Sequence, residues 1–186
     1  QHDDHADGDR QLAPAAATGA PVAEFTSPFA LLQAMDRHTF RVDLGVKDPV
    51  LWDIENPELY RAVVSVISEN EAFDNYETNF GFRTLLFTAR DGFFLNGKKV
   101  EIKGVCNHHD LGALGAAINT RALERQLEIL KEMGCNAIRT SHNPPAPELL
   151  DLCDKMGFLV QDEAFAAAQR HQQHRLVHGP GQRGHL

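Results

Sequence analysis

The sequence has no long hydrophobic segment and no excess of positive charge. Its apolar runs fall far short of the roughly 20 residues that span a bilayer, and the stretch from Gln1 to Arg10 is acidic and rich in histidine rather than basic and then apolar. The formal net charge is −8 over 186 residues, whereas nucleic-acid-binding surfaces need clustered lysine and arginine. We therefore expect neither a membrane segment nor a nucleic-acid partner.

Cysteine is scarce as well, with only Cys106, Cys135 and Cys153 in the chain. Each lies within a predicted strand or helix, and an odd number does not suit a disulfide framework. We expect small buried thiols, which favour a reducing, cytoplasmic compartment, with a periplasmic or secreted location left open. Cys106 lies close to two histidines, but this spacing is not that of a zinc site.

The first half of the chain is predicted to be β structure after an irregular start. Residues 1–24 are rich in aspartate, histidine, alanine and glycine and lack periodicity, so we expect them to bury too little apolar surface and to be disordered. Residues 25–91 carry strand patterns at 39–48, 60–68 and 79–88. Short turns without intervening helices predict part of an antiparallel β-sandwich, with Trp52 in its core.

From residue 92 the pattern changes to alternating strands and helices. Asn96-Gly97 predicts a tight hairpin turn. Buried strands are expected at 100–106, 135–140 and 158–161, with helices between them from Asn119 to Gly134 and from Pro147 to Gly157. Consecutive strand–helix units of this size imply a parallel sheet. A closed β/α barrel needs eight strands and about 250 residues, so we expect the first third of a barrel from a larger enzyme.

Polar residues follow the first two of these parallel strands. His108, His109 and Asp110 come after the first strand, and Ser141 and His142 come after the second. Because barrel enzymes build their sites at the C-terminal ends of the strands, these residues predict part of an active site.

A series of motifs between residues 40 and 165 carries a family resemblance. In order they are Pro49-Val50-Leu51-Trp52, Pro57-Glu58-Leu59-Tyr60, Phe80-Gly81-Phe82-Arg83, Phe94-Leu95-Asn96-Gly97-Lys98, Lys103-Gly104-Val105, His108-His109-Asp110-Leu111-Gly112, Asn136-Ala137-Ile138-Arg139-Thr140-Ser141-His142-Asn143-Pro144 and Asp162-Glu163-Ala164. The chain thus resembles glycoside hydrolase family 2, and most closely its β-galactosidases. The resemblance implies an immunoglobulin-like sandwich over residues 25–91 and the start of a (β/α)₈ TIM barrel over residues 92–165.

The resemblance also implies retaining hydrolysis of terminal β-galactosides, with two carboxylates about 5 Å apart. In the family the acid/base glutamate follows the fourth barrel strand and the nucleophile lies on the seventh, beyond the matching residues. We therefore assign no catalytic residue and expect the chain alone to be inactive. The alternatives are a β-glucuronidase or β-mannosidase of the same family, or a non-catalytic carbohydrate-binding remnant.

The residues carried over by the resemblance bind or support the substrate. His108 and His142 match the family's sugar-contacting histidines. His109 and Asp110 are also assigned to substrate binding, although neighbours leaving a strand point to opposite sides.

Three further residues are expected to support the pocket. Arg139 matches an arginine near its base, and Glu163 or Asp162 is expected to bond it. Adjacent carboxylates at a strand end cannot straddle one glycosidic bond, so we do not interpret these two as an acid/base pair.

Two features depart from the family or depend on its incomplete barrel. Some members hold magnesium, but Ala166-Ala167-Ala168 departs from the family pattern, so no metal or other cofactor is assigned.

Residues 166–186 are interpreted as a tail foreign to the family, in which the spacing of His171, His174 and His178 would allow only adventitious metal binding. An open barrel edge also predicts self-association.

Overall fold

The computed structural model describes residues 6–7, 9–15, 19–68 and 71–163. The chain forms two compact units, one of residues 1–52 and 58–83 and the other of residues 53–57 and 84–186. Within the described residues no helix is both long enough and apolar enough to span a membrane. The predicted histidine-rich tail, including His171, His174 and His178, lies outside the described residues.

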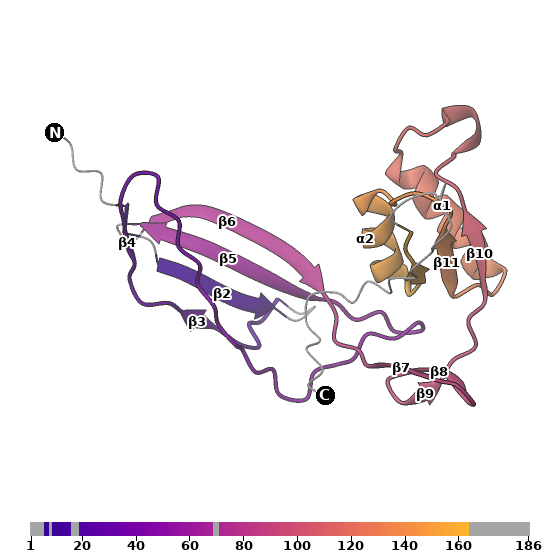
Figure 1. The fold of residues 1–186 in the computed structure, drawn as a ribbon, viewed down its shortest axis with the longest axis horizontal. Helices are drawn as coiled ribbons and strands as arrows, with labels where there is room; N and C mark the ends of the chain where they lie inside the picture. The colour runs from indigo at the N-terminus through magenta and orange to yellow at the C-terminus, as the bar shows by residue number, and fades with distance from the viewer. Residues whose placement is uncertain (1–5, 8, 16–18, 69–70, 164–186) are drawn as a thin grey trace. The chain divides into compact units, whose positions relative to one another are not determined.

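The first unit is built on an antiparallel sheet with the strand order β3-β2-β5-β6 (Figure 1). Its strands are β2 (Asp9–Ala15), β3 (Phe25–Thr26), β5 (Tyr60–Ser68) and β6 (Glu71–Phe80), and β1 (Ala6–Asp7) pairs separately with β4 (Leu31–Leu32). The strand expected at 60–68 is confirmed as β5. Within residues 1–24, for which the sequence predicts disorder, the structure has β2 paired along its whole length with β5.

The core of this unit forms around Trp52, which is 2% exposed, as predicted. The guanidinium of Arg83 lies 4.8 Å from the centre of the indole. Gly81 approaches the same side chain so closely that a Cβ there would lie 3.0 Å from Trp52 Cβ. Tyr60 is also buried, and its hydroxyl accepts a hydrogen bond from the backbone N–H of Val50 at 2.8 Å.

The strand expected at 39–48 is absent. Phe40, Val42, Leu44 and Val46 are half-buried and the residues between them are exposed, so the alternation is real. No described strand pairs with this segment, however. Period-2 burial therefore reports extended backbone lying on a surface, whereas a strand also needs a hydrogen-bonded partner.

The second unit begins with a three-stranded antiparallel sheet of β7 (Leu85–Thr88), β8 (Gly92–Leu95) and β9 (Lys98–Lys99). The predicted hairpin is confirmed: Asn96 and Gly97 connect β8 to β9 with positive φ angles of 51° and 77°, which a two-residue type I′ turn requires. The Asn96 side chain accepts a hydrogen bond from the N–H of Thr84 at 3.0 Å, which ties the turn to β7.

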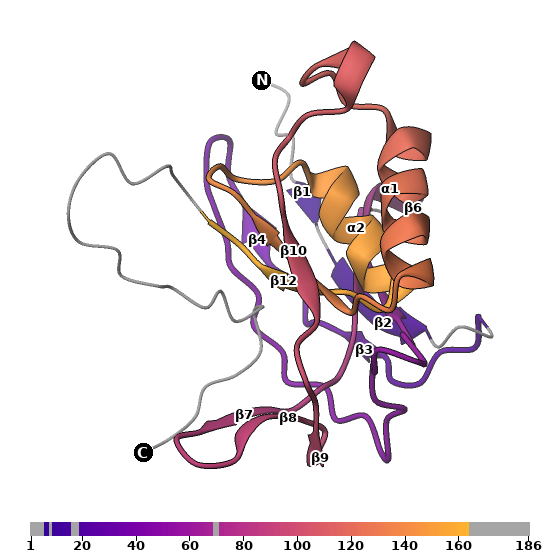
Figure 2. The same ribbon diagram turned by 90° about the vertical axis from the view of Figure 1, so that its right-hand side faces the viewer.

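The site is positioned by a parallel sheet, β10-β11-β12, with two helices on one face (Figure 2). Asn119 caps the first helix by accepting a hydrogen bond from the N–H of Ala122, and Pro147 is the first residue of the second. Both helices are followed by a glycine at positive φ, Gly134 and Gly157, as the sequence predicts. The elements are β10 (Gly104–Asn107), the short helix η1 (Gly112–Leu114), α1 (Thr120–Glu132), β11 (Ala137–Thr140), α2 (Pro147–Met156) and β12 (Leu159–Gln161).

Apolar side chains from both helices pack against β11. Leu127 of α1, Ile138 of β11 and Phe158 before β12 are each at most 2% exposed, and full burial of such a side chain contributes about 1.5–3 kcal/mol. The strand expected at 100–106 is shorter and less buried than predicted: β10 starts at Gly104 and alternates exposed and half-buried residues. It pairs with β11 only, so one edge of it is unpaired within the described sheet.

Lys131 joins three segments of the second unit. Its ammonium donates hydrogen bonds to the carbonyls of Ile54 and Met156 at 3.0 and 2.9 Å. It also lies 5.3 Å from the centre of the Phe158 ring. The segment 53–57 is thereby held at the C-terminal end of α2, next to Gly157.

Candidate active site

The predicted site residues lie where β10, β11 and β12 end. The three strands are parallel, and Cys106, Arg139 and Gln161 are paired in one row across them. The segments that follow the strands therefore leave from the same edge of the sheet. This register brings together residues 107–110, 140–143 and 162–163, which are far apart in the sequence.

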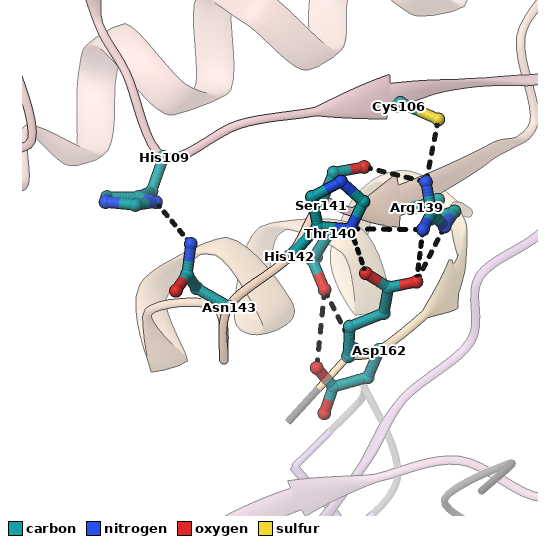
Figure 3. Close-up of polar contacts among 9 residues, drawn as sticks. Cys106, His109, Arg139, Thr140, Ser141, His142, Asn143 and Asp162 are labelled. Carbon is teal, nitrogen blue, oxygen red and sulfur yellow. Dashed lines mark hydrogen bonds and ion pairs between the residues drawn. The ribbon is translucent and has the colours of Figure 1, made fainter. Parts of the chain in front are cut away.

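Arg139, His142 and Glu163 form one hydrogen-bonded network (Figure 3). The Arg139 Nε–H donates to Glu163 Oε1 at 2.7 Å, and its Nη2 forms an ion pair with the same oxygen. The other oxygen, Oε2, lies 2.9 Å from His142 Nδ1. Arg139 Nη2 is 3.2 Å from that same nitrogen. Both carboxylate oxygens of Glu163 are therefore occupied, one by each partner.

The surroundings of Glu163 favour its ionised form. Partial burial alone would raise the pKa, but hydrogen bonds from His142 and Arg139 and the charge of Arg139 outweigh it and lower the pKa of Glu163 below its ordinary value. The Glu163 side chain is 13% exposed, against 45% for His142. The carboxylate is thus a fixed negative charge beneath a more accessible imidazole.

Arg139 also reaches β10 and the loop after β11. Its Nη1 donates to Ser141 Oγ at 3.1 Å and to Cys106 Sγ at 3.3 Å. The hydrogen bonds from Arg139 and Ser141 lower the pKa of Cys106. The expectation that all three cysteines are buried is wrong for Cys106, which is exposed because it faces away from the helices. Only Cys153 is fully buried, and that burial raises its pKa to about 12.

The two histidines expected to contact sugar lie close together. The ring centres of His108 and His142 are 5.9 Å apart, with an interplanar angle of 79°. His109 lies instead against Asn143, whose Nδ2 is 3.3 Å from the His109 Nδ1. Asp110 accepts a hydrogen bond from the N–H of Gly112 at 2.7 Å. The substrate-binding assignments of these four residues stay predictions, with the geometry favouring His108 and His142.

The structure separates the two carboxylates at the end of β12. Glu163 bonds Arg139, whereas Asp162 accepts a hydrogen bond from Thr140 Oγ1 at 3.4 Å. Thr140 Oγ1 in turn accepts from the N–H of Glu163 at 3.1 Å. Sequence reasoning did not identify the roles of Thr140 and Ser141. Thr140 ends an apolar strand and Ser141 follows it, as the sequence shows. The contacts of Thr140 depend on the register between β11 and β12, whereas the contact of Ser141 depends on where the nearby Arg139 side chain points.

A hollow adjoins the histidines on the side of α1. His108, His109 and Asn143 line it together with apolar residues that include Leu111, Ile118 and Leu149. Among the described residues no group of three or more histidine, cysteine, aspartate or glutamate side chains could hold a metal ion. Glu163, the carboxylate that contacts His142, already has Arg139 and His142 as partners.

Family models match both parts of the chain. Residues 11–83 match the glycosyl hydrolases family 2, and residues 88–179 match the TIM barrel domain of the same family. The chain belongs to glycosyl hydrolase family 2, and it combines part of the family's immunoglobulin-like sandwich with the first βα units of its TIM barrel. The match to the barrel domain extends to residue 179, beyond the last family motif recognised in the sequence and beyond the described residues.

Individual relatives agree with this assignment. A β-galactosidase of Bacteroides ovatus is 58% identical over 149 residues, which are 80% of this chain and 17% of the relative. A putative β-glucuronidase of Formosa agariphila is 45% identical over 124 residues, 67% of this chain and 12% of the relative. The crystal structure of a family 2 member from Bacteroides cellulosilyticus superposes with a TM-score of 0.80 at 38% identity, covering 86% of this chain and 22% of that one. The chain therefore spans less than a quarter of the length of these proteins.

Proposed function

We propose that this chain supplies the hydroxyl-binding side of the sugar subsite in a retaining β-galactosidase. The supporting observation is the convergence of His108 and His142 at the C-terminal edge of the sheet, with His142 backed by Glu163 and Arg139. Neutral imidazoles donate through one nitrogen and accept through the other, which suits sugar hydroxyls. The 58% identity to a β-galactosidase supports a galactoside as the substrate.

In this proposal the chain does not hydrolyse glycosides by itself. Retaining hydrolysis needs two carboxylates about 5 Å apart on either side of the scissile bond. Asp162 and Glu163 are adjacent in sequence and are held by Thr140 and by Arg139 with His142. Because a positioned acid or base contributes about 10²–10⁴-fold, we expect no turnover above background from this chain alone.

A β-glucuronidase is the second candidate, because several relatives at 34–45% identity carry that name. A glucuronide differs from a galactoside in bearing a carboxylate, which calls for a cationic partner. Arg139 is already paired with Glu163, so it is not available to neutralise a second carboxylate.

The test is a hybrid enzyme in which residues 40–163 of this chain replace the matching segment of the Bacteroides ovatus β-galactosidase. We expect the hybrid to cleave p-nitrophenyl β-galactoside and not to cleave the corresponding glucuronide. The reverse preference would support the second candidate. No cleavage of either by a folded hybrid would contradict the proposed function.

Substitutions in the hybrid test the two histidines. His108→Ala and His142→Ala should each lower kcat/KM by about 10- to 100-fold, the equivalent of one or two lost hydrogen bonds in the transition state. Their melting temperatures should barely change, since the side chains contact substrate more than core. His109→Ala, whose imidazole faces Asn143, is the matched control and should have the smaller effect.

A further inference from the structure

The two neighbours of His142 Nδ1 require opposite protonation of that nitrogen. Glu163 Oε2, at 2.9 Å, can only accept a hydrogen bond, so it needs a proton on Nδ1. Arg139 Nη2, at 3.2 Å, can only donate, so it needs a lone pair there. A neutral imidazole carries one proton, and its position decides what the opposite nitrogen offers to a ligand.

We propose that Glu163 is a positioning residue that fixes His142 as the Nδ1–H tautomer, so that Nε2 accepts a hydrogen bond from a hydroxyl of the sugar. The tautomer stands on this network alone, whereas the hydroxyl rests on the proposed function. The alternative tautomer would bring a nitrogen lone pair to 2.9 Å from a carboxylate oxygen, which is repulsive. The Nδ1–H tautomer converts the same contact into a charge-assisted hydrogen bond.

Arg139 does not need His142 as an acceptor. Its Nε and Nη2 both bind Glu163 Oε1, and its Nη1 donates to Ser141 and Cys106. The guanidinium can therefore direct its protons to other acceptors and leave Nδ1 to Glu163. Glu163 has no equivalent choice, because Oε1 is already engaged and Oε2 faces His142.

Glu163 is held in place by a backbone hydrogen bond and by the burial of its side chain. The backbone N–H of Glu163 donates to Thr140 Oγ1 at 3.1 Å, and the side chain is 13% exposed. Its lowered pKa keeps it ionised at neutral pH. A fixed, charged acceptor is the arrangement that holds a histidine in one tautomer elsewhere in proteins.

His109 provides an internal reference of the opposite kind. Its Nδ1 faces Asn143 Nδ2 at 3.3 Å, and an amide NH₂ can only donate. His109 should therefore favour the Nε2–H tautomer in the same sample. The two histidines are on neighbouring loops of the same site, so a difference between them reports the local partner and not a general property of the protein.

The direct test is nitrogen-15 NMR of the histidine side chains in the 186-residue chain, at a pH well above the ordinary histidine pKa of about 6.5. His142→Gln assigns the signal. We expect the Nδ1–H form to exceed Nε2–H by at least about tenfold at His142. An excess of Nε2–H in the wild-type chain would overturn the proposal, and this measurement needs no variant.

Glu163→Gln tests whether Glu163 is the cause. It keeps the size of the side chain but removes the charge and leaves Arg139 free to turn toward Nδ1. The tautomer ratio at His142 should fall by about tenfold or more, since charge-assisted hydrogen bonds are roughly twice as strong as neutral ones. Asp162→Asn is the matched control, because Asp162 contacts Thr140 and not His142. This variant should leave the tautomer ratio unchanged. An unchanged ratio in Glu163→Gln would overturn the role of Glu163.

The direction of the sugar hydrogen bond is tested in the hybrid enzyme with deoxy and deoxyfluoro galactosides modified at positions 3, 4 and 6. Fluorine can accept a hydrogen bond but cannot donate one. At the position that His142 recognises, both analogues should therefore lose kcat/KM to the same extent, and His142→Ala should abolish that loss. A fluoro analogue that retains most of kcat/KM at this position would show a donating Nε2–H and overturn the inference. An inactive hybrid whose NMR shows the expected tautomer would contradict the proposed function while upholding the role of Glu163 in setting the tautomer.

Discussion

Gly157 ends α2 shortly before β12, the strand that leads to Asp162 and Glu163. Its replacement by alanine should destabilise the second unit strongly. The residue has a φ of +73°, and a Cβ there would lie 2.1 Å from the carbonyl oxygen of Ile54. That carbonyl also accepts a hydrogen bond from Lys131 at 3.0 Å. The segment 53–57 therefore cannot move away from a new methyl group without weakening this contact.

The magnitude follows from two separable terms. Left-handed backbone costs an alanine about 1–2 kcal/mol, and forcing a methyl group into a filled space costs about 1–3 kcal/mol. Gly157→Ala should thus lower the free energy of unfolding by about 3 kcal/mol. Gly134→Ala is the matched control, because Gly134 follows α1 with a φ of +86° and has no atom within 4 Å of the Cβ position. Gly134→Ala should therefore lower the free energy of unfolding only by the cost of the left-handed backbone, about 1–2 kcal/mol.

Urea denaturation followed by far-UV circular dichroism measures both variants. With a clash term of about 1–3 kcal/mol and an m-value of about 1–3 kcal/mol per molar urea, the midpoint of Gly157→Ala should fall at least about 0.3 M below that of Gly134→Ala. Equal midpoints would show that the close approach of Ile54 to Gly157 does not exist in solution.

Three further outcomes are expected. Lys131→Met should lower the free energy of unfolding by about 1.5–3 kcal/mol in the same assay, because the charged hydrogen bonds to Ile54 and Met156 are lost. The lowered pKa of Glu163 gives a stabilisation that is complete above the ordinary glutamate value of about 4.3 and is lost as the pH falls through the folded-state value; acid titration of Glu163→Gln should lack this component, and identical titrations would contradict it. Because β10 and β12 each pair only with β11 in the described sheet, sedimentation should reveal species heavier than 20.6 kDa, and a purely monomeric chain would contradict this expectation.

The helices and the hairpin could be predicted from the sequence because their signals are local. Asn119, Pro147 and the two glycines that follow the helices stand at fixed offsets from the apolar stripes. The segment 39–48 shows the limit of such reasoning. The burial of its side chains alternates as the sequence pattern predicts. Whether such a segment pairs as a strand, however, depends on residues elsewhere in the chain.

The site was predictable to the level of the sheet edge but not of the individual bonds. The order of strands and helices places His108 and His142 at one edge, which the structure confirms. Which of the two carboxylates bonds Arg139 depends on the register of β11 with β12. The exposure of Cys106 could not be predicted for a related reason. Cys106 pairs with Arg139 and lies on the face of the sheet that carries no helix. An apolar run in the sequence does not show which of its residues face the helices.

The polar network also indicates how the work of such a site can be divided among the units of a barrel. Arg139, His142 and Glu163 come from two adjacent strands and their loops. Within the described residues, the hydrogen-bond partners of Glu163 lie on β11 or in the loop that follows it. Such a network can form as soon as β11 and β12 pair, before more distant parts of a barrel are in place, because only a short loop closure is needed. The hydroxyl-binding side of the proposed subsite is therefore a local property of consecutive βα units. The retaining reaction differs in this respect, because its two carboxylates must face each other across the substrate and hence depend on strands far apart in the chain.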